Sequence, residues 1–143
     1  MDAGINVGVS VDTAPLTGNC HLFGILKLLR NAENAKAFDE FKLSARRVLQ
    51  MGTIDGARAL GIDDRVGSLT PGKRADLVLI RKGPFGDSIE DDPCAHVLLQ
   101  TSPREIDTVI VDGELRMSGG VLKGFDAVRG ASMIGTSRRR ILG

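Results

Sequence analysis

The sequence is poor in aromatic residues and in cysteine. It contains no tryptophan or tyrosine, and aromatic residues make up 3% of the chain. This scarcity argues against base-stacking platforms for nucleic acid and against aromatic cages for ligands. The two cysteines, Cys20 and Cys94, lie far apart in the sequence and lack the close spacing of a zinc knuckle. We therefore expect reduced thiols in a cytoplasmic protein.

The chain also lacks an excess of one charge and any long apolar run. Nineteen basic residues face eighteen acidic ones, for a net charge of +1, which offers no electrostatic footprint for nucleic acid or an anionic membrane. No apolar run reaches the ~18 residues of a membrane-spanning helix. The one dense basic run, Arg138 to Arg140, is expected to be a solvated tail. Neither nucleic acid nor a membrane is expected as a partner.

Histidine is equally scarce. His21 and His96 are the only two, and neither has a second histidine at the spacing of a metal-binding motif. We expect both to be structural or surface residues. Length sets a further limit, because 143 residues suffice for one domain but not for a complete (β/α)8 barrel, which typically takes ~250.

The first ordered pattern is a strict alternation over residues 5–12, which predicts a strand with one aliphatic and one small, polar face. Asp12 ends the polar face, just before a loop that contains glycine and proline. Catalytic groups of α/β proteins occupy such a position. The same position equally suits an aspartate that caps the loop or the next helix.

Helical patterns follow, and a β-rich pattern comes after them. Apolar spacing predicts a helix from about Asn19 to Ala37, and Ser44 and Thr53 are candidate N-caps of two further helices. Gly61 is expected to end the last of these helices. Beyond it, β-like runs span residues 75–80 and 106–111, and Asp112-Gly113 has the pattern of a tight hairpin turn.

Two blocks carry a resemblance to a known family. They are LSARRVLQMGTIDGARALG at residues 43–61 and RVGSLTPGKRADLV at residues 65–78. Both closely resemble the C-terminal third of metal-dependent amidohydrolases, in the branch of the triazine hydrolases, cytosine deaminase and S-adenosylhomocysteine deaminase. Residues 107–113 are similar to the family's late β segment, and residues 9–13 are similar to its last barrel strand. Gly52 stands where the family usually has alanine.

The resemblance implies an α/β fold made of two parts. Residues 1–61 would form the last strand and closing helices of a (β/α)8 hydrolase barrel. Residues 62–143 would form part of the small β-sandwich that flanks the barrel, together with a C-terminal tail.

The resemblance also implies a hydrolase that cleaves a C–N bond, as a deaminase does, or a C–Cl bond of a small cyclic substrate. Asp12 would bind a divalent metal, zinc or iron, and would take a proton from the attacking water. The loop from Thr13 to Asn19 would lie at the mouth of the substrate pocket. The family's histidine ligands are expected upstream of the region that this chain resembles. We therefore expect the chain alone neither to hold the metal nor to be active.

A hypothesis of a different class is a non-catalytic module, derived from the amidohydrolase C-terminus, that oligomerises or binds a partner. A strand at residues 5–11 would otherwise leave open edges, and apolar helix faces would be exposed. This hypothesis predicts a homo-oligomer. A third possibility is that several copies assemble a barrel-like closure.

Overall fold

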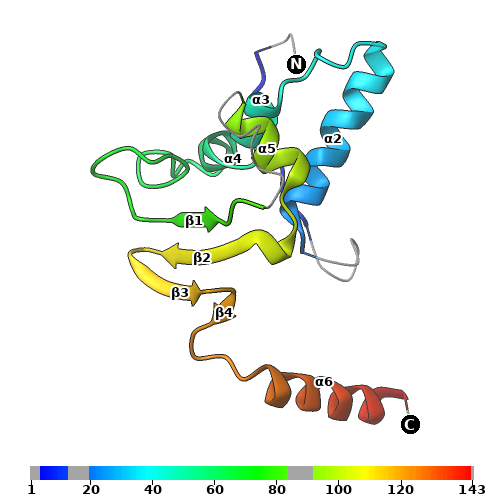
Figure 1. The fold of residues 1–143 in the computed structure, drawn as a ribbon, viewed down its shortest axis with the longest axis vertical. Coiled ribbons are helices and arrows are strands. Elements are labelled where there is room, and N and C mark those ends of the chain that lie inside the picture. The colour runs from blue at the N-terminus through cyan, green and yellow to red at the C-terminus, as the bar shows by residue number, and fades with distance from the viewer. Residues whose placement is uncertain (1–3, 13–19, 84–91, 143) are drawn as a thin grey trace.

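The computed structural model describes residues 4–12, 20–83 and 92–142. A group of helices lies on one side of a small sheet, and a further helix follows the sheet at the C-terminus (Figure 1). The elements, in chain order, are α2 (Leu22–Ala37), α3 (Ala45–Met51), α4 (Ile54–Ala59), β1 (Leu77–Ile80), α5 (Pro93–Gln100), η2 (Pro103–Glu105), β2 (Ile106–Val111), β3 (Glu114–Ser118), β4 (Val121–Leu122) and α6 (Ala127–Leu142). The predicted α/β class is confirmed.

The helices after the first loop form where the sequence predicts them. The helix expected from about Asn19 begins at Leu22 and ends at Ala37. Ser44 caps α3, since its side chain accepts a hydrogen bond from the backbone N–H of Arg47 at 3.2 Å.

Two residues flank α4 that the sequence predicts to start and end it, Thr53 and Gly61. The prediction for Thr53 as a side-chain N-cap is wrong, and that for Gly61 is confirmed. Thr53 precedes the helix, but its hydroxyl donates to the Leu49 carbonyl of α3 at 2.7 Å and does not cap α4. Gly61 follows the helix with φ +67°, a conformation that favours glycine.

The strand predicted over residues 5–12 is not formed. None of residues 4–12 is paired in a sheet, and the only strands among the described residues belong to a separate antiparallel sheet. A strand needs a neighbour to satisfy its backbone groups, and the described part of the chain offers none here. Part of the aliphatic face is consequently open to solvent, with Ile5 72% and Val7 39% exposed.

The sheet has four antiparallel strands in the order β1-β2-β3-β4. Asp112 and Gly113 join β2 to β3 with φ values of +52° and +79°, and Val111 pairs with Glu114. Positive φ at both central residues defines a type I′ turn, so the predicted hairpin is confirmed. The Arg74 guanidinium donates to the Asp112 carboxylate at 2.7 Å and ties the chain before β1 to this turn.

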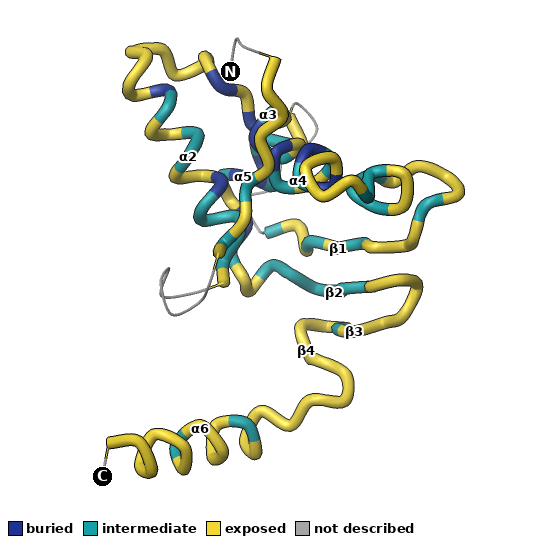
Figure 2. Tube along the Cα trace, turned by 180° about the vertical axis from the view of Figure 1, so that it is seen from behind, coloured by how far each residue is buried: buried dark blue, intermediate teal, exposed yellow. Residues whose placement is uncertain are grey.

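The hydrophobic core lies among the helices (Figure 2). Helix α5 has no counterpart among the elements expected from the sequence; it packs against α2 and α3 and contributes Leu98 to the core. Asp92 caps this helix by accepting from the Ala95 backbone N–H at 2.9 Å. The core therefore draws on both sides of residue 61. Its buried members are Leu26, Leu43, Ala45, Val48 and Leu98.

The C-terminal segment, expected to be a solvated tail, is helical and exposed. Arg138 to Arg140 lie in the last turns of α6, a 16-residue helix without a single buried residue. Among the described helices, none combines the length and the apolar character that a bilayer-spanning segment needs.

Candidate functional site

Asp12 lies at the end of an irregular segment, residues 4–12, that rests against α3 and α4. The Val9 backbone N–H donates to the Met51 carbonyl at 3.0 Å. The Asn6 side-chain amide donates to the Asp55 carbonyl at 2.9 Å. Val9 also packs against the hydrophobic core. These contacts position the segment without any sheet pairing.

Gly8 is the point of closest approach between this segment and α4. A Cβ added to Gly8 would lie 2.9 Å from the Gly56 Cα, a backbone atom that cannot rotate away. Only glycine fits here without a shift of one backbone against the other. The small, polar face predicted from the alternation thus lies partly against a helix.

Asp12 itself is exposed and has an unusual backbone conformation. Its φ is +57°, and its backbone N–H donates to the Ser10 hydroxyl at 3.3 Å. Two other described non-glycine residues have positive φ, Phe38 at the C-cap of α2 and Asp112 in the hairpin turn. Asp12 lies in neither kind of structure. Aspartate tolerates this region better than most residues, and such outliers often mark functional positions.

The other predicted site residues, Thr13 and Asn19, lie outside the described residues. His96 is buried in α5, and the His21 ring lies edge-on to Phe23 with ring centroids 6.3 Å apart. Both histidines thus have structural surroundings, as the sequence predicts.

The donor set for a metal ion is incomplete in this part of the chain. The described residues contain no group of three or more histidine, cysteine, aspartate or glutamate side chains that could hold a metal ion. A catalytic zinc site uses three protein ligands. A single exposed carboxylate at Asp12 does not fit this requirement, so the described residues do not form a metal centre by themselves.

A buried ionic centre that the sequence did not reveal lies at the start of α4. Asp55 is 3% exposed and accepts hydrogen bonds from the guanidinium groups of Arg47 and Arg58, the latter at 2.8 Å. The hydrogen bond from Arg47 lowers the pKa of the Asp55 carboxyl most strongly; burial acts in the opposite direction, and Arg58 adds to the lowering. A carboxylate held by two cations is a poor proton acceptor. Asp55 therefore links α4 to α3 through its pair with Arg47.

Asn34 is a second buried polar group that the sequence did not reveal. Its side-chain oxygen accepts from the Leu43 backbone N–H at 2.7 Å, and its amide donates to the Glu40 carbonyl at 2.6 Å. This side chain holds the loop between α2 and α3 in place. Polar residues in helices usually face solvent, so only the burial of Asn34 could have revealed this role.

Comparison with known proteins identifies the family. Residues 1–116 match the sequence profile of the Amidohydrolase family. The chain is 35% identical over 119 residues to a 5-methylthioadenosine/S-adenosylhomocysteine deaminase of Desulforudis audaxviator, covering 83% of this chain and 28% of that protein. It is 31% identical over 119 residues to an S-triazine hydrolase of Gordonia rubripertincta, covering 83% of this chain and 25% of that protein.

Solved structures agree with the sequence comparison. A zinc-bound adenosine deaminase of Xanthomonas campestris superposes with a TM-score of 0.85 at 25% identity, covering 98% of this chain and 32% of the other. An atrazine chlorohydrolase of Arthrobacter aurescens TC1, complexed with zinc, gives a TM-score of 0.83 at 27% identity, covering 94% of this chain and 30% of the other. The chain spans about a third or less of the length of these relatives. On the match over residues 1–116, it belongs to the amidohydrolase family.

Proposed function

We propose that this chain contributes the C-terminal part of an amidohydrolase that hydrolyses a C–N or C–Cl bond of a small cyclic substrate. The observation that carries the proposal is the family match over residues 1–116. Relatives named as deaminases and as a triazine hydrolase support the two bond types. In this proposal residues 1–61 belong to the barrel domain and residues 62–143 to the small β-sandwich, with α5 returning to the helical layer.

In the proposed enzyme Asp12 supplies a carboxylate to the active site. A carboxylate near the reacting atoms can accept a proton from the attacking water and pass it to a leaving amine or halide. The position of Asp12 supports this role, because it is exposed at the end of a segment anchored by Asn6, Gly8 and Val9. Thr13 and Asn19, in the loop that follows, are proposed to contact substrate.

A divalent metal, zinc or iron, is proposed for the complete enzyme. Two of the similar structures contain zinc. Asp12 would be one ligand; because the described residues hold no group of three possible ligands, the remaining ligands would have to come from another part of the enzyme. The free thiols of Cys20 and Cys94 are consistent with a reducing, cytoplasmic location, which we also propose.

Complementation tests the proposal. The chain is co-expressed with the part of the Desulforudis audaxviator deaminase that it does not match, and ammonia release from S-adenosylhomocysteine is measured with zinc or iron. We expect turnover from the mixture and none from the chain alone. Asp12→Asn should abolish turnover, whereas Asp39→Asn, an equal charge change on an exposed residue, should leave it unchanged. Turnover by the chain alone, or an active Asp12→Asn mixture, would refute the proposal.

The second candidate function is a non-catalytic module that oligomerises or binds a partner. The exposure of aliphatic side chains on several elements favours it, notably Ile5, Leu79 and Ile141 at 72%, 49% and 81%. Exposed apolar side chains mark interaction sites where they form a contiguous patch. A failed complementation combined with stable self-association would favour this candidate over the enzyme.

A further inference from the structure

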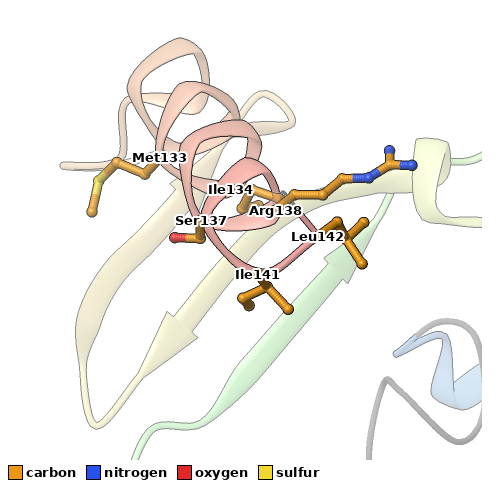
Figure 3. Close-up of a pocket in the computed structure, with 6 residues that line it drawn as sticks. All are labelled: Met133, Ile134, Ser137, Arg138, Ile141 and Leu142. Atoms are coloured by element: carbon orange, nitrogen blue, oxygen red, sulfur yellow. The ribbon is translucent and has the colours of Figure 1, made fainter.

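A hollow lies along helix α6, but it offers a small molecule no enclosing site. Its volume is about 600 Å³, and all of its lining residues come from α6 itself (Figure 3). They are Met133, Ile134, Ser137, Arg138, Ile141 and Leu142. A ligand site is normally a cleft that buries most of the ligand, and one helix supplies only one wall. The hollow is therefore the outer surface of an exposed helix.

Residues 10–12 lie beyond the backbone contacts that hold the rest of their segment on the helices. Val9 makes the last backbone hydrogen bond between the segment and the helices, to the Met51 carbonyl at 3.0 Å. In the described part of the chain, no backbone group of residues 10–12 is hydrogen-bonded to α3 or α4. Ser10 and Asp12 are both exposed. The described hydrogen bonds to the helices therefore do not extend to the Asp12 backbone.

Ser10 contacts the Asp12 backbone directly. Its hydroxyl oxygen accepts a hydrogen bond from the Asp12 N–H at 3.3 Å, which is the one hydrogen bond that Asp12 makes among the described residues. The N–H lies in the rigid peptide plane between Val11 and Asp12, so this bond restrains the whole plane. The orientation of the plane relative to Val9 and the helices thus depends on the Ser10 side chain.

The direction of the Asp12 carboxylate is set by this plane and by the φ angle of Asp12. Rotation about the N–Cα bond swings the Cβ atom, and the carboxylate with it, relative to the preceding plane. In an extended backbone, position 12 would share a face with Asn6 and Gly8, which lie against α4. The φ of +57° breaks that alternation at Asp12. Loss of the Ser10 hydrogen bond would therefore let the carboxylate change direction while residues 4–9 stay in place.

We propose that Ser10 is a positioning residue for Asp12, whose hydroxyl fixes the peptide plane from which the Asp12 carboxylate projects. This inference rests on the role proposed for Asp12 in the hydrolytic reaction. A carboxylate that accepts a proton from the attacking water has to lie within hydrogen-bond reach of it. A misplacement of about 1 Å can lower a rate by about 10²-fold. Ser10 is exposed and is not part of the hydrophobic core, so its effect falls on Asp12 and not on the stability of the fold.

Steady-state kinetics of the complemented enzyme test the effect of Ser10 on the reaction. The chain is again combined with the part of the Desulforudis audaxviator deaminase that it does not match. Ser10→Ala should lower kcat about tenfold and leave the KM for S-adenosylhomocysteine within about twofold of its starting value. Ser10→Thr keeps the hydroxyl and should restore kcat. Ser132→Ala, the matched control, removes an exposed serine hydroxyl from α6 and should change neither constant.

NMR relaxation of the chain alone tests the contact without any turnover. We expect the order parameter of the Asp12 N–H to fall from about 0.85 to about 0.6 in Ser10→Ala, whereas that of Val9 stays unchanged. Ser10→Thr should keep the Asp12 N–H rigid. Urea denaturation should give the same free energy of unfolding for the unchanged chain and for both variants, since Ser10 is exposed.

Failure of the positioning role and failure of the proposed function give different results. A mixture that contains the unchanged chain and shows no turnover refutes the proposed function, and the role of Ser10 in catalysis with it. If that mixture is active, three results would each overturn the role of Ser10 alone. They are an unchanged kcat in Ser10→Ala, an Asp12 N–H that stays as rigid in this variant as in the unchanged chain, and a loss of kcat that Ser10→Thr does not restore.

Discussion

The guanidinium of Arg47, on α3, donates a hydrogen bond to the buried carboxylate of Asp55, on α4. The same aspartate uses its backbone carbonyl to accept from Asn6. One residue thereby links two helices to the segment that ends in Asp12. The stability of the pair and the position of that segment are consequently coupled.

Replacing Arg47 with methionine should destabilise the chain. Methionine keeps the aliphatic packing but leaves Asp55 with Arg58 as its only cation. We expect the free energy of unfolding to fall by about 1 to 3 kcal/mol, measured by urea denaturation. Arg46→Met removes an exposed arginine from the same helix and should change it by less than about 0.5 kcal/mol. Equal stability of the two variants would contradict a structural role for the pair.

Stability should decrease in acid, in part through Asp55. The hydrogen bond from Arg47 holds the pKa of Asp55 below its ordinary value in the folded chain. A carboxyl with a depressed folded pKa stabilises the fold above its unfolded pKa, and this contribution is lost as the pH falls through the folded pKa. We expect a constant free energy of unfolding down to about pH 5 and a decrease below about pH 4.

Two other carboxyls contribute to the same decrease. Hydrogen bonds from Ser102 lower the pKa of Glu105, and a hydrogen bond from Arg81 lowers that of Asp107. Asp55→Asn should therefore flatten the decrease without removing it. Urea denaturation between pH 3 and pH 7 provides the measurement, and parallel curves for the two proteins would show that Asp55 has no part in it.

Gly8→Ala should destabilise the chain more than Gly52→Ala, although the added methyl group lies 2.9 Å from another atom in both variants. At Gly8 that atom is the Gly56 Cα, so backbone must move, and we expect a loss of about 1 to 3 kcal/mol. At Gly52 it is the Cδ1 of Leu26, the end of a side chain that can rotate, and we expect a loss below about 1 kcal/mol. Thermal denaturation compares the two, and an undisturbed Gly8→Ala variant would contradict the close approach.

Asn34→Ala should be more harmful than Asn31→Ala on the same helix. The first change leaves the buried Leu43 N–H and the Glu40 carbonyl without their partner, at a cost of about 1 to 3 kcal/mol for each group that stays unsatisfied. Asn31 is exposed, so its replacement should be nearly neutral. Urea denaturation distinguishes the two outcomes. Similar losses would mean that water replaces the Asn34 contacts.

The elements that the sequence predicted correctly depend on signals within a few residues. Ser44 caps its helix, Gly61 adopts positive φ, and Asp112-Gly113 forms the turn because each conformation is decided locally. Residues 5–12 have the alternation of a strand, but pairing requires a distant neighbour. Helix α5 was missed because its eight residues are too few to show a helical period, and packing against α2 and α3 determines its position.

Of the candidate site, only Asp12 could be singled out from the sequence. Asp12 was singled out by its place after an alternating segment and by the family resemblance, and its role stays a prediction. Asn34 and Asp55 resemble ordinary helix residues until their burial is known. The sequence places Asp55 between two arginines, Arg47 and Arg58. Without the fold, this pattern cannot be told apart from the charged residues of a solvated helix surface.

Helix α5 lies between β1 and β2 in the sequence but between the helices in space, where Leu98 packs with Leu26 and Val48. The chain between the first pair of strands therefore includes a helix that belongs to the hydrophobic core. Helices and sheet are thus expected to melt in one cooperative transition. Amide exchange in β1 and β2 should slow or quicken together with exchange in α2 when the core is altered.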